Sequence, residues 1–419
     1  MKVYKFGGAS VKNADAIENL FSIVQKEKSE LIIVVSAMDK TTNNLELVWE
    51  YQLNGNKDKA LEKIAEINTF HISIVNDLRI ENNGHLIQQI NSFTEKLKDY
   101  INSSISGNKA FCYDQIVSYG ELLSTTIISH YLNYKKLDNL WVDARELIKT
   151  TNHHQEARVN WEKSKKQINK LINGNSKTYV TQGFIGATDD GITTTLGREG
   201  SDYSAAILAW SKEAEEVIIW KDVSGLLNAD PKLFKETEQL FKISFKEAIE
   251  LSYLGASVIH PKTIKPLQNK GIPLSIRSFL NDSQKGSVIS NNGENDRDIP
   301  SFIFKPNQLL LSITTKDFSF IFEDHISDLF QLFASYGLKV HLMQNSALSF
   351  SVCGIIKAAM LNQLIEKLSE NYIVRYNERV DLLSIRHYKN FDLPEIVKNQ
   401  EVLIQQRSRS TIRYVFKKY

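Results

Sequence analysis

Short runs of apolar residues recur along the first two thirds of the chain, and helical patterns separate them. The runs are Val3–Phe6, Leu31–Ser36, Leu140–Val142, Tyr179–Thr181, Val217–Trp220 and Ile272–Ile276. Several are apolar at consecutive positions, as strands buried between two helix layers must be. Strands that alternate with helices predict an α/β fold, in which an open and mostly parallel sheet is sandwiched by helices.

The pattern changes twice within and after this region. Residues 44–104 are polar-rich with helical periodicity, which indicates a helical hairpin added over one end of the sheet. The segment Ser287–Asp298 is rich in Asn and Asp and nearly devoid of core-forming residues, which is typical of a linker. We therefore expect a first domain over 1–286 and a linker over 287–301.

Beyond the linker the pattern becomes strand, helix, strand, strand, helix, strand. The expected elements are Leu309–Ile313, Ile326–Ala334, Leu338–Met343, Leu348–Cys353, Ala358–Leu368 and Ile373–Arg375. This βαββαβ order is the ferredoxin-like arrangement. A tail from Leu382 adds strand-like pieces at Leu382–Ile385 and Thr411–Phe416, too short to repeat the unit. We expect a second domain over 302–419, with one complete unit and a short partial one.

Composition narrows the function classes. With 51 basic and 49 acidic residues, the net charge of +2 gives no electrostatic footprint for nucleic acid or an anionic membrane. No apolar run reaches the roughly 18 residues of a membrane span, and the N-terminus has a strand pattern rather than that of a signal peptide. Cys112 and Cys353 are the two cysteines and lie far apart in sequence, which favours a reducing compartment. A cytoplasmic location is the simplest expectation.

The first strand runs directly into paired glycines, in the sequence VYKFGGAS that begins at Val3. Backbone N–H groups at Gly7 and Gly8 can approach a ligand closely because glycine has no Cβ. Lys5 in the strand and the start of the next helix add positive charge at the same point. These groups predict an anion site, with phosphate as the expected anion and a plain tight turn as the alternative.

A second Gly-rich segment, TTTLGREGSDYSAA from Thr193, places Arg198 between two glycines. An arginine in such a loop can present its planar guanidinium group to a carboxylate or phosphate through two hydrogen bonds. Ser201 and Asp202 stand where a helix over Ser204–Ala209 would start. The alternative is that these two residues only cap the helix and Arg198 is a surface charge.

Three further segments contain residues that are candidates for binding or catalysis. Glu121, in SYGELLS, lies in a largely apolar helical stretch, so we expect it to face a cleft and meet a cation, unless it lies on the helix's exposed face. Lys221 and Asp222, in WKDVSGLLNADPK, follow a predicted strand, where open α/β sheets bind ligands. His260 has no other metal-ligating residue at suitable spacing, so we expect a packed or capping histidine.

Eight segments, in one order over residues 1–280, together resemble the aspartate kinases (aspartokinases) of the amino acid kinase superfamily. They are KFGGAS, VSAM followed by TTN, SYGE, TQGFIG, TTTLGREGSD, WKDVSGLLNADP, GASVIHPKT and IPLSIRS. Any one segment is a loose match, whereas eight in order are specific. The βαββαβ region after them is similar to the family's regulatory ACT domains.

The resemblance implies transfer of the γ-phosphoryl group of ATP to the β-carboxylate of L-aspartate. The product would be 4-phospho-L-aspartate, at the start of lysine, threonine and methionine biosynthesis. A carboxylate with a pKa near ~4 is already ionised at neutral pH, so the reaction needs positioning and charge neutralisation rather than a strong base. Mg²⁺ is implied mainly through the phosphates. Aspartate would bind to the N-terminal part of the catalytic domain and ATP to its C-terminal part.

The resemblance also assigns roles to individual positions. Lys5 would lie beside the transferring phosphoryl group, and Asp202 would hold cationic groups in place without abstracting a proton. Arg198 would bind a carboxylate of aspartate, and Glu121 would receive its α-ammonium group. Smaller pocket positions match Ser36, Thr42, Phe184 and Ser201. The nucleotide positions match Lys5, Gly7, Gly8, Ser10, Lys221, Asp222, Leu227, Lys232, Ser257 and Val258.

The chain departs from the usual family pattern at several of these positions. It has Ala9 where threonine is usual, and Glu199 where glycine or a small residue is usual. Lys221 stands where threonine is usual, and many members carry lysine at the position of Ser257. We therefore expect Lys221 to supply the phosphate-directed cation that Ser257 cannot.

ACT regions of this family commonly dimerise and bind an end-product amino acid, which implies a homodimer with lysine or threonine as effector. His341 stands where lysine-sensitive relatives often carry an aspartate, so it argues against lysine and leaves threonine or no effector. Two alternative functions stay open: a kinase for glutamate or N-acetylglutamate, and a non-catalytic amino-acid sensor. An acetylated substrate has no α-ammonium group for Glu121. Retention of Lys5, Arg198 and Asp202 argues against a sensor.

Overall fold

The computed structural model describes residues 1–103, 108–256, 259–294, 296–297, 299–317, 319–388 and 396–417. The chain divides into two compact units. The first contains Met1–Leu226, Leu240–Ile249 and Val258–Gly293. The second contains Leu227–Gln239, Glu250–Ser257 and Glu294–Tyr419. Two short segments that the sequence pattern groups with the first domain therefore belong to the second unit.

The first unit is built on an eight-stranded sheet in the order β3-β4-β2-β1-β7-β9-β10-β8. The strands are β1 (Lys2–Phe6), β2 (Leu31–Val35), β3 (Leu140–Val142), β4 (Thr178–Gln182), β7 (Glu216–Lys221), β8 (Lys242–Ser244), β9 (Leu274–Ser278) and β10 (Ser287–Ser290). From β3 to β9 every neighbouring pair is parallel, and β10 runs antiparallel to β9. The predicted α/β fold with a mostly parallel sheet is confirmed.

The segment that begins at Ser287 was expected to be a linker, and this expectation was wrong for its first four residues. They form β10, in which Ile289 is fully buried and the Ser287 hydroxyl accepts a hydrogen bond from the Leu226 N–H group. A four-residue strand with two apolar positions is too short to show a period in the sequence.

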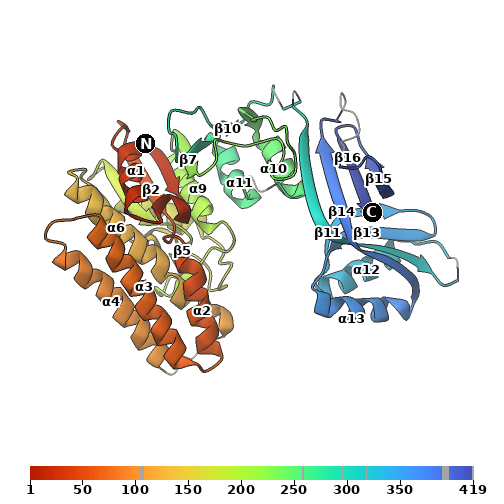
Figure 1. Cartoon of the computed structure of the whole chain (residues 1–419), viewed down its shortest axis with the longest axis horizontal. Coiled ribbons are helices and arrows are strands. Elements are labelled where there is room, and N and C mark those ends of the chain that lie inside the picture. The colour runs from red at the N-terminus through yellow and green to blue at the C-terminus, as the bar shows by residue number, and fades with distance from the viewer. Residues whose placement is uncertain are drawn as a thin grey trace. The chain divides into compact units, whose positions relative to one another are not determined.

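Helices flank this sheet (Figure 1). They are α1 (Ala14–Val24), α5 (Lys109–Val117), α6 (Tyr119–Tyr134), α7 (Ala144–Leu147), α8 (Trp161–Leu171), α9 (Gly200–Lys212) and α11 (Pro261–Lys270). A further helix, α10 (Phe245–Leu254), begins in the first unit and ends in the second. A 3₁₀ turn over Gly8–Val11 precedes α1, and a small antiparallel pair joins β5 (Ile185–Ala187) to β6 (Thr193–Thr195).

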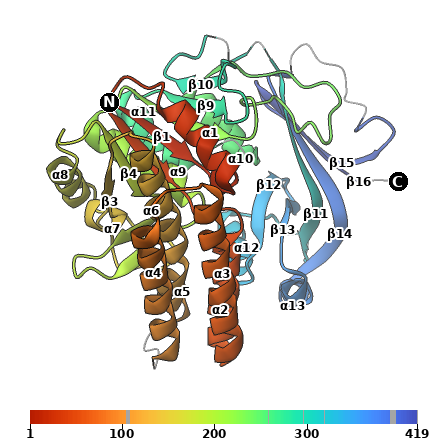
Figure 2. The same ribbon diagram turned by 60° about the vertical axis from the view of Figure 1, so that its left-hand side comes forward.

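The helical extension has three helices in place of the expected hairpin. They are α2 (Thr41–Leu53), α3 (Lys57–Asp77) and α4 (Gly84–Asn102). Figure 2 shows them running away from the sheet beside α5 and α6. The first break falls at Gly55 and the second near Arg79 and Asn82, all with positive φ angles that end a helix.

The side chains of β1 lie alternately on the two faces of the sheet, because successive residues of a strand point to opposite sides. Tyr4 and Phe6 belong to the hydrophobic core that contains Ile17 and Leu20 of α1. Lys5 lies on the other side of the strand, where α9 packs against β1. The strand therefore places its one internal lysine beneath the start of α9.

The second unit contains a six-stranded antiparallel sheet in the order β12-β13-β11-β14-β16-β15. Its elements are β11 (Ser301–Thr315), α12 (Glu323–Ser335), β12 (Lys339–Asn345), β13 (Ser349–Ile355), α13 (Ala358–Ser369), β14 (Tyr372–Arg386), β15 (Glu401–Arg407) and β16 (Thr411–Lys417). The first six follow the expected βαββαβ order. Leu382–Ile385, expected as a separate strand, is the second half of β14, and β15 with β16 extends the same sheet.

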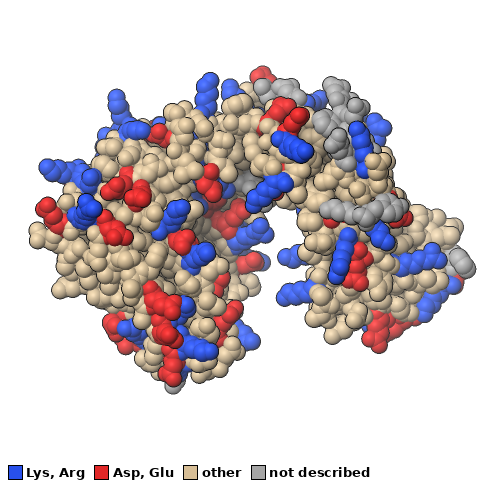
Figure 3. Space-filling view, viewed as in Figure 1, with Lys and Arg blue, Asp and Glu red and all other residues tan. Residues whose placement is uncertain are grey.

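Charged side chains of both signs mix over the face of the molecule in Figure 3, in keeping with the near-zero net charge. Within the described residues, no helix is long and apolar enough to cross a membrane.

Candidate active site

The first unit contains a cavity of about 670 Å³ at the carboxyl ends of its parallel strands, where open α/β sheets bind ligands. The residues that line it are Lys5, Ser36, Thr42, Tyr113, Glu121, Gln155, Glu156, Phe184, Gly197, Arg198, Glu199, Gly200, Ser201, Asp202 and Lys221. Both proposed catalytic residues and every proposed aspartate-binding residue are in this set. Lys5 and Arg198 therefore face one common space, on which the sequence interpretation depends.

Three helices begin at this cavity. Thr42, Glu121 and Asp202 lie in the first turns of α2, α6 and α9, respectively. The unpaired N–H groups of a helix start carry partial positive charge, which favours anions. The cavity therefore has an electropositive backbone lining in addition to its basic side chains.

Lys5 and Asp202 form an ion pair inside the cavity. The Lys5 Nζ lies 2.8 Å from the Asp202 Oδ1, and the two side chains are only 11% and 5% exposed. Such a pair holds an ammonium group in a fixed place, because its counter-charge sits on a rigid helix start. A Cβ built at Gly7 would lie 3.5 Å from the Lys5 Nζ, an ordinary van der Waals contact, so packing alone does not require glycine there.

Glu121 is buried, which excludes the exposed alternative. Its Oε1 accepts a hydrogen bond of 3.2 Å from the Ala37 N–H group, and its Oε2 is a buried atom without a hydrogen-bond partner among the described residues. Burial raises the pKa of Glu121 to about 8, and the nearby Lys5 charge opposes part of that rise. An incoming cation would give this carboxylate the partner that it lacks.

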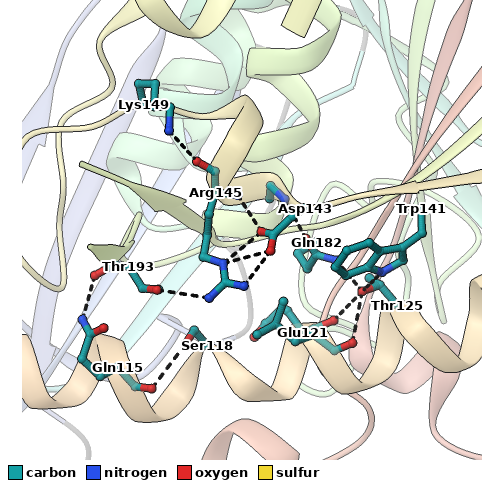
Figure 4. A network of polar contacts seen from close by, with 12 residues as sticks. Gln115, Ser118, Glu121, Thr125, Trp141, Asp143, Arg145, Lys149, Gln182 and Thr193 are labelled. Atoms are coloured by element: carbon teal, nitrogen blue, oxygen red, sulfur yellow. Dashed lines mark hydrogen bonds and ion pairs between the residues drawn. The ribbon is translucent and has the colours of Figure 1, made fainter. Parts of the chain in front are cut away.

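The helix that presents Glu121 is anchored at the sheet edge (Figure 4). The Thr125 hydroxyl donates to the Glu121 carbonyl oxygen at 2.8 Å. The same hydroxyl accepts hydrogen bonds from the Gln182 side chain on β4 and the Trp141 indole on β3, at 2.6 and 3.0 Å. These bonds fix the first turn of α6 relative to the strands, and with it the position of the carboxylate.

Arg198 lies in a tightly constrained loop. Gly197 has a φ of +71°, and Glu199, the residue before α9, has a φ of +54° in the left-handed region. Gly200 is required by packing, since a Cβ there would come within 2.5 Å of the Phe184 ring. The Glu199 Oε2 accepts a hydrogen bond of 2.8 Å from the His260 N–H group. The left-handed backbone at Glu199 is the conformation that glycine adopts at no steric cost, which explains why glycine or a small residue is usual at this position in the family.

The sequence interpretation missed Tyr113, Gln155 and Glu156, which also line the cavity. The segment that contains Gln155 and Glu156 is held by Asp114, whose carboxylate is fully buried. Asp114 accepts hydrogen bonds from the Thr195 hydroxyl at 2.6 Å and from the Gln155 N–H group at 3.1 Å, and it contacts the His154 Nδ1 at 2.7 Å. Asp114, four residues before Ser118, is a polar residue at an inward position, and this was the signal in the sequence that could have identified its role.

Several nucleotide predictions fall outside the lining. Gly8 packs against the neighbouring loop, since a Cβ there would lie 2.7 Å from the Ala37 carbonyl oxygen, and Ser10 is only 3% exposed. Asp222 is exposed directly after β7. Further predicted positions are Leu227 and Lys232, in the second unit, and Ser257 and Val258, which lie outside the described residues. All these nucleotide roles stay predictions.

His260 acts as a helix cap. Its Nδ1 accepts a hydrogen bond of 3.2 Å from the Lys262 N–H group at the start of α11. The expected capping role is therefore confirmed.

Comparisons with known proteins agree with this geometry. Residues 1–278 match the amino acid kinase family. The chain is 29% identical to the lysine-sensitive aspartokinase 3 of Escherichia coli, over 84% of this chain and 77% of that protein. It is 30% identical to a bifunctional aspartokinase/homoserine dehydrogenase of Arabidopsis thaliana, over 88% of this chain, but spans only 42% of that longer protein.

Solved structures extend the similarity to both units. The structure of E. coli aspartokinase III in complex with lysine and aspartate superposes with a TM-score of 0.82 at 26% identity, covering 99% of this chain and 95% of that one. The same enzyme in complex with aspartate and ADP gives a TM-score of 0.81 at 25% identity. The chain therefore belongs to the amino acid kinase family, and among its members it resembles the aspartokinases over nearly its whole length.

Proposed function

We propose that this protein is an aspartate kinase that phosphorylates the β-carboxylate of L-aspartate with ATP. The observation that carries the proposal is the grouping of the Lys5–Asp202 ion pair, Arg198 and the buried Glu121 around one cavity. E. coli aspartokinase III, similar over both units, has been solved with aspartate and ADP, which supports these two ligands.

Aspartate carries two carboxylates and one ammonium group, and the cavity offers a partner for each. Arg198 would bind the α-carboxylate through its guanidinium fork. Glu121 would receive the α-ammonium group, whose charge offsets the desolvation that raises the pKa of this carboxyl. The β-carboxylate would then point toward Lys5.

Phosphoryl transfer needs the attacking oxygen, the phosphorus and the leaving oxygen in line, with charge neutralised around them. Lys5 would stabilise negative charge on the transferring group, and Asp202 would hold that ammonium in place. The bond from the β-carboxylate oxygen to the γ-phosphorus forms as the bond to the β-phosphate oxygen of ATP breaks. Lys221 lines the same cavity at the end of β7 and would supply a second cation to the phosphates.

Mg²⁺ would be held chiefly by phosphate oxygens and water. The donor chemistry of the cavity is compatible with this, because Asp202 is already paired with Lys5 and leaves the phosphates as the main ligands. When bound, the ion would neutralise phosphate charge.

Trapping the product tests the proposal. With ATP, Mg²⁺ and aspartate, the acyl phosphate should react with hydroxylamine to give aspartyl hydroxamate, and reactions without ATP should give none. Glutamate and N-acetylglutamate test the other kinases of this fold, and Glu121 disfavours N-acetylglutamate, which has no α-ammonium group. No hydroxamate with any of the three acids would leave the amino-acid sensor as the better interpretation.

The second unit would serve regulation. Its βαββαβ order supports an ACT-type region that forms a homodimer and binds an amino-acid effector. Cytoplasmic location stays the expectation from the cysteine pattern.

A further inference from the structure

A second cavity of the first unit lies among α8, α9 and α11, and has a volume of about 380 Å³. Helix α9 packs against the other two helices, and Figure 1 shows α9 and α11 close together. The lining includes Trp161, Tyr203, Trp210, Lys262, Lys265 and Pro266. None of these residues lines the cavity that contains Lys5. Small-molecule sites typically occupy about 300–1,000 Å³, so this cavity has the size of a ligand site.

Aromatic rings dominate the wall. The ring centroids of Trp161 and Trp210 lie 4.9 Å apart at an angle of 72°, and those of Trp161 and Tyr203 lie 6.2 Å apart. All three side chains are partly exposed. Two of the five tryptophans of the chain thus keep apolar surface in contact with solvent at one place. Such rings are the groups that binding sites use most, since each offers a large rigid contact area.

Lysines surround these rings. The Lys262 Nζ lies 5.6 Å from the Tyr203 ring centroid, and those of Lys165 and Lys270 lie 5.4 and 5.8 Å from the Trp210 ring. Lys270 is neutralised by an ion pair of 2.6 Å with Glu213. In the part of the chain that the structure describes, no ion pair engages Lys165, Lys262 or Lys265.

Burial in the folded chain also disfavours the positive charge of one of these lysines. Burial lowers the pKa of Lys262 more than the nearby charges of Glu156 and Glu199 raise it, so the charge of Lys262 lacks full compensation in the folded chain. A ligand anion beside this ammonium group would offset that cost.

We propose that this cavity binds a small aromatic anion, a planar ring that carries a carboxylate or a phosphate group. The ring would pack against Trp161, Trp210 and Pro266, and the anion would pair with Lys262 and Lys265. A ring without charge would leave the lysines uncompensated, and an anion without a ring would leave the tryptophans in water.

An occupant of this cavity would act on the proposed active site through two short connections. The Lys262 Nζ donates a hydrogen bond of 2.8 Å to the Leu196 carbonyl oxygen, two residues before Arg198. Tyr203 directly follows Asp202 in α9. An anion that draws the Lys262 ammonium toward itself would loosen the Arg198 loop and raise the KM for aspartate. This effect on turnover rests on the proposed function, whereas ligand binding does not.

Calorimetric titration of the full chain with phenyl phosphate and with phenylacetate tests binding and distinguishes the two anion types. We expect at least one to bind with a Kd of about 1 mM or lower, a modest affinity of roughly −4 kcal/mol. Methyl phosphate and acetate, which lack the ring, and benzyl alcohol, which lacks the charge, should bind at least tenfold more weakly. Absence of binding by both aromatic anions would overturn the proposal.

Variants locate the site. Lys265→Gln and Trp210→Leu should each weaken binding about tenfold, the loss of one contact worth about 1.4 kcal/mol. Lys170→Gln is the matched control, because Lys170 is an exposed lysine of α8 outside the lining and its loss changes the net charge equally. Circular dichroism checks that Trp210→Leu folds, and Lys265→Gln tests the site without altering a ring. Unchanged binding in Lys265→Gln, or displacement of the probe by ATP, would refute the assignment.

Kinetics then separate this site from the proposed function. Phenyl phosphate should raise the KM for aspartate in the wild-type chain and not in Lys265→Gln. Binding that depends on Lys265 in a protein without kinase activity would refute the proposed function and uphold this site.

Discussion

Glu121 is the residue whose environment is hardest to explain without a ligand. A carboxyl group that is 3% exposed, with one oxygen lacking a partner among the described residues, costs folding free energy. Sequence alone left its exposure open, because a glutamate in an apolar helix can face either way. Its burial is set by the packing of α6 against the sheet edge, which no local pattern encodes.

Glu121→Gln should lower kcat/KM for aspartate by about 10²–10³-fold, since breaking a buried ion pair costs roughly 3–5 kcal/mol. Wild-type KM for aspartate should fall as pH rises toward 8, because the raised pKa of about 8 means that free Glu121 must lose its proton to receive an ammonium group. Steady-state kinetics from pH 6 to 9 measure both effects. Glu50→Gln, an exposed glutamate of α2, is the matched control.

Glu121→Gln should also change the pH dependence of the free energy of unfolding. The folded chain keeps a proton on Glu121 up to about pH 8, whereas the unfolded chain loses it near 4.5, so the wild-type free energy of unfolding should fall across that interval. Glu121→Gln removes this contribution. Its Tm relative to wild type should therefore rise from pH 5 to pH 8.5 in thermal melts, and a constant difference would contradict the raised pKa.

Lys221→Met tests whether this lysine supplies the second phosphate-directed cation. Loss of one preorganised charge contact typically lowers kcat by about 10²–10³-fold. Lys221→Arg should recover part of the activity, and Lys170→Met, which removes an exposed lysine of α8, should leave kcat unchanged. Normal turnover in Lys221→Met would show that the cation comes from elsewhere.

At the scale of elements, the start of α9 combines function with backbone strain. Glu199 occupies the left-handed region with a φ of +54°, which costs a residue with a Cβ about 1–2 kcal/mol. The hydrogen bond from the His260 N–H group to its carboxylate offsets part of this cost.

Glu199→Gly should therefore be more stable than Glu199→Ala by about 1 kcal/mol, because both lose the hydrogen bond and only alanine keeps the strain. Urea denaturation measures the difference. At Glu162, in the first turn of α8, the order should reverse, since the backbone there is helical and glycine is the poorer helix former. The same order at both positions would argue against strain at Glu199.

Asp114 joins α5, β6 and the segment of Gln155, which no single element could position alone. Asp114→Asn keeps the shape but replaces one acceptor oxygen by a donor group. We expect a loss of about 1–3 kcal/mol in unfolding free energy and a higher KM for aspartate with a smaller change in kcat. Denaturation and kinetics together check this, and an equal loss in Asp114→Ala would show that the acceptor oxygen is what matters.

For the whole molecule, strands buried on both faces were predictable, because each gives a continuous apolar run. β8, β10 and the β5–β6 pair have three or four residues each and show no period, so the sequence did not reveal them. Most of the candidate site was predictable because its residues sit in motifs at strand ends and helix starts. Gln155 and Glu156 were missed because their place depends on Asp114, distant in sequence.

The regulatory response that we propose would depend on the second unit. Burial and the charges of Lys305 and Arg413 lower the pKa of His341 to about 4, so this side chain is neutral at pH 7 and offers a lysine effector no negative charge to pair with. The E. coli relative, by contrast, is named for its sensitivity to lysine. We expect no heat of binding on titration with lysine, and threonine as the effector to test next. Tight lysine binding would overturn this expectation.

The order in which the chain visits its two units has a practical consequence. It passes from one unit to the other after Leu226, Gln239, Ile249, Ser257 and Gly293. A chain truncated after Gly293 would keep two segments whose native neighbours had been deleted. Any exchange of the second unit between related enzymes should therefore transplant Leu227–Gln239 and Glu250–Ser257 together with all residues from Glu294 onward.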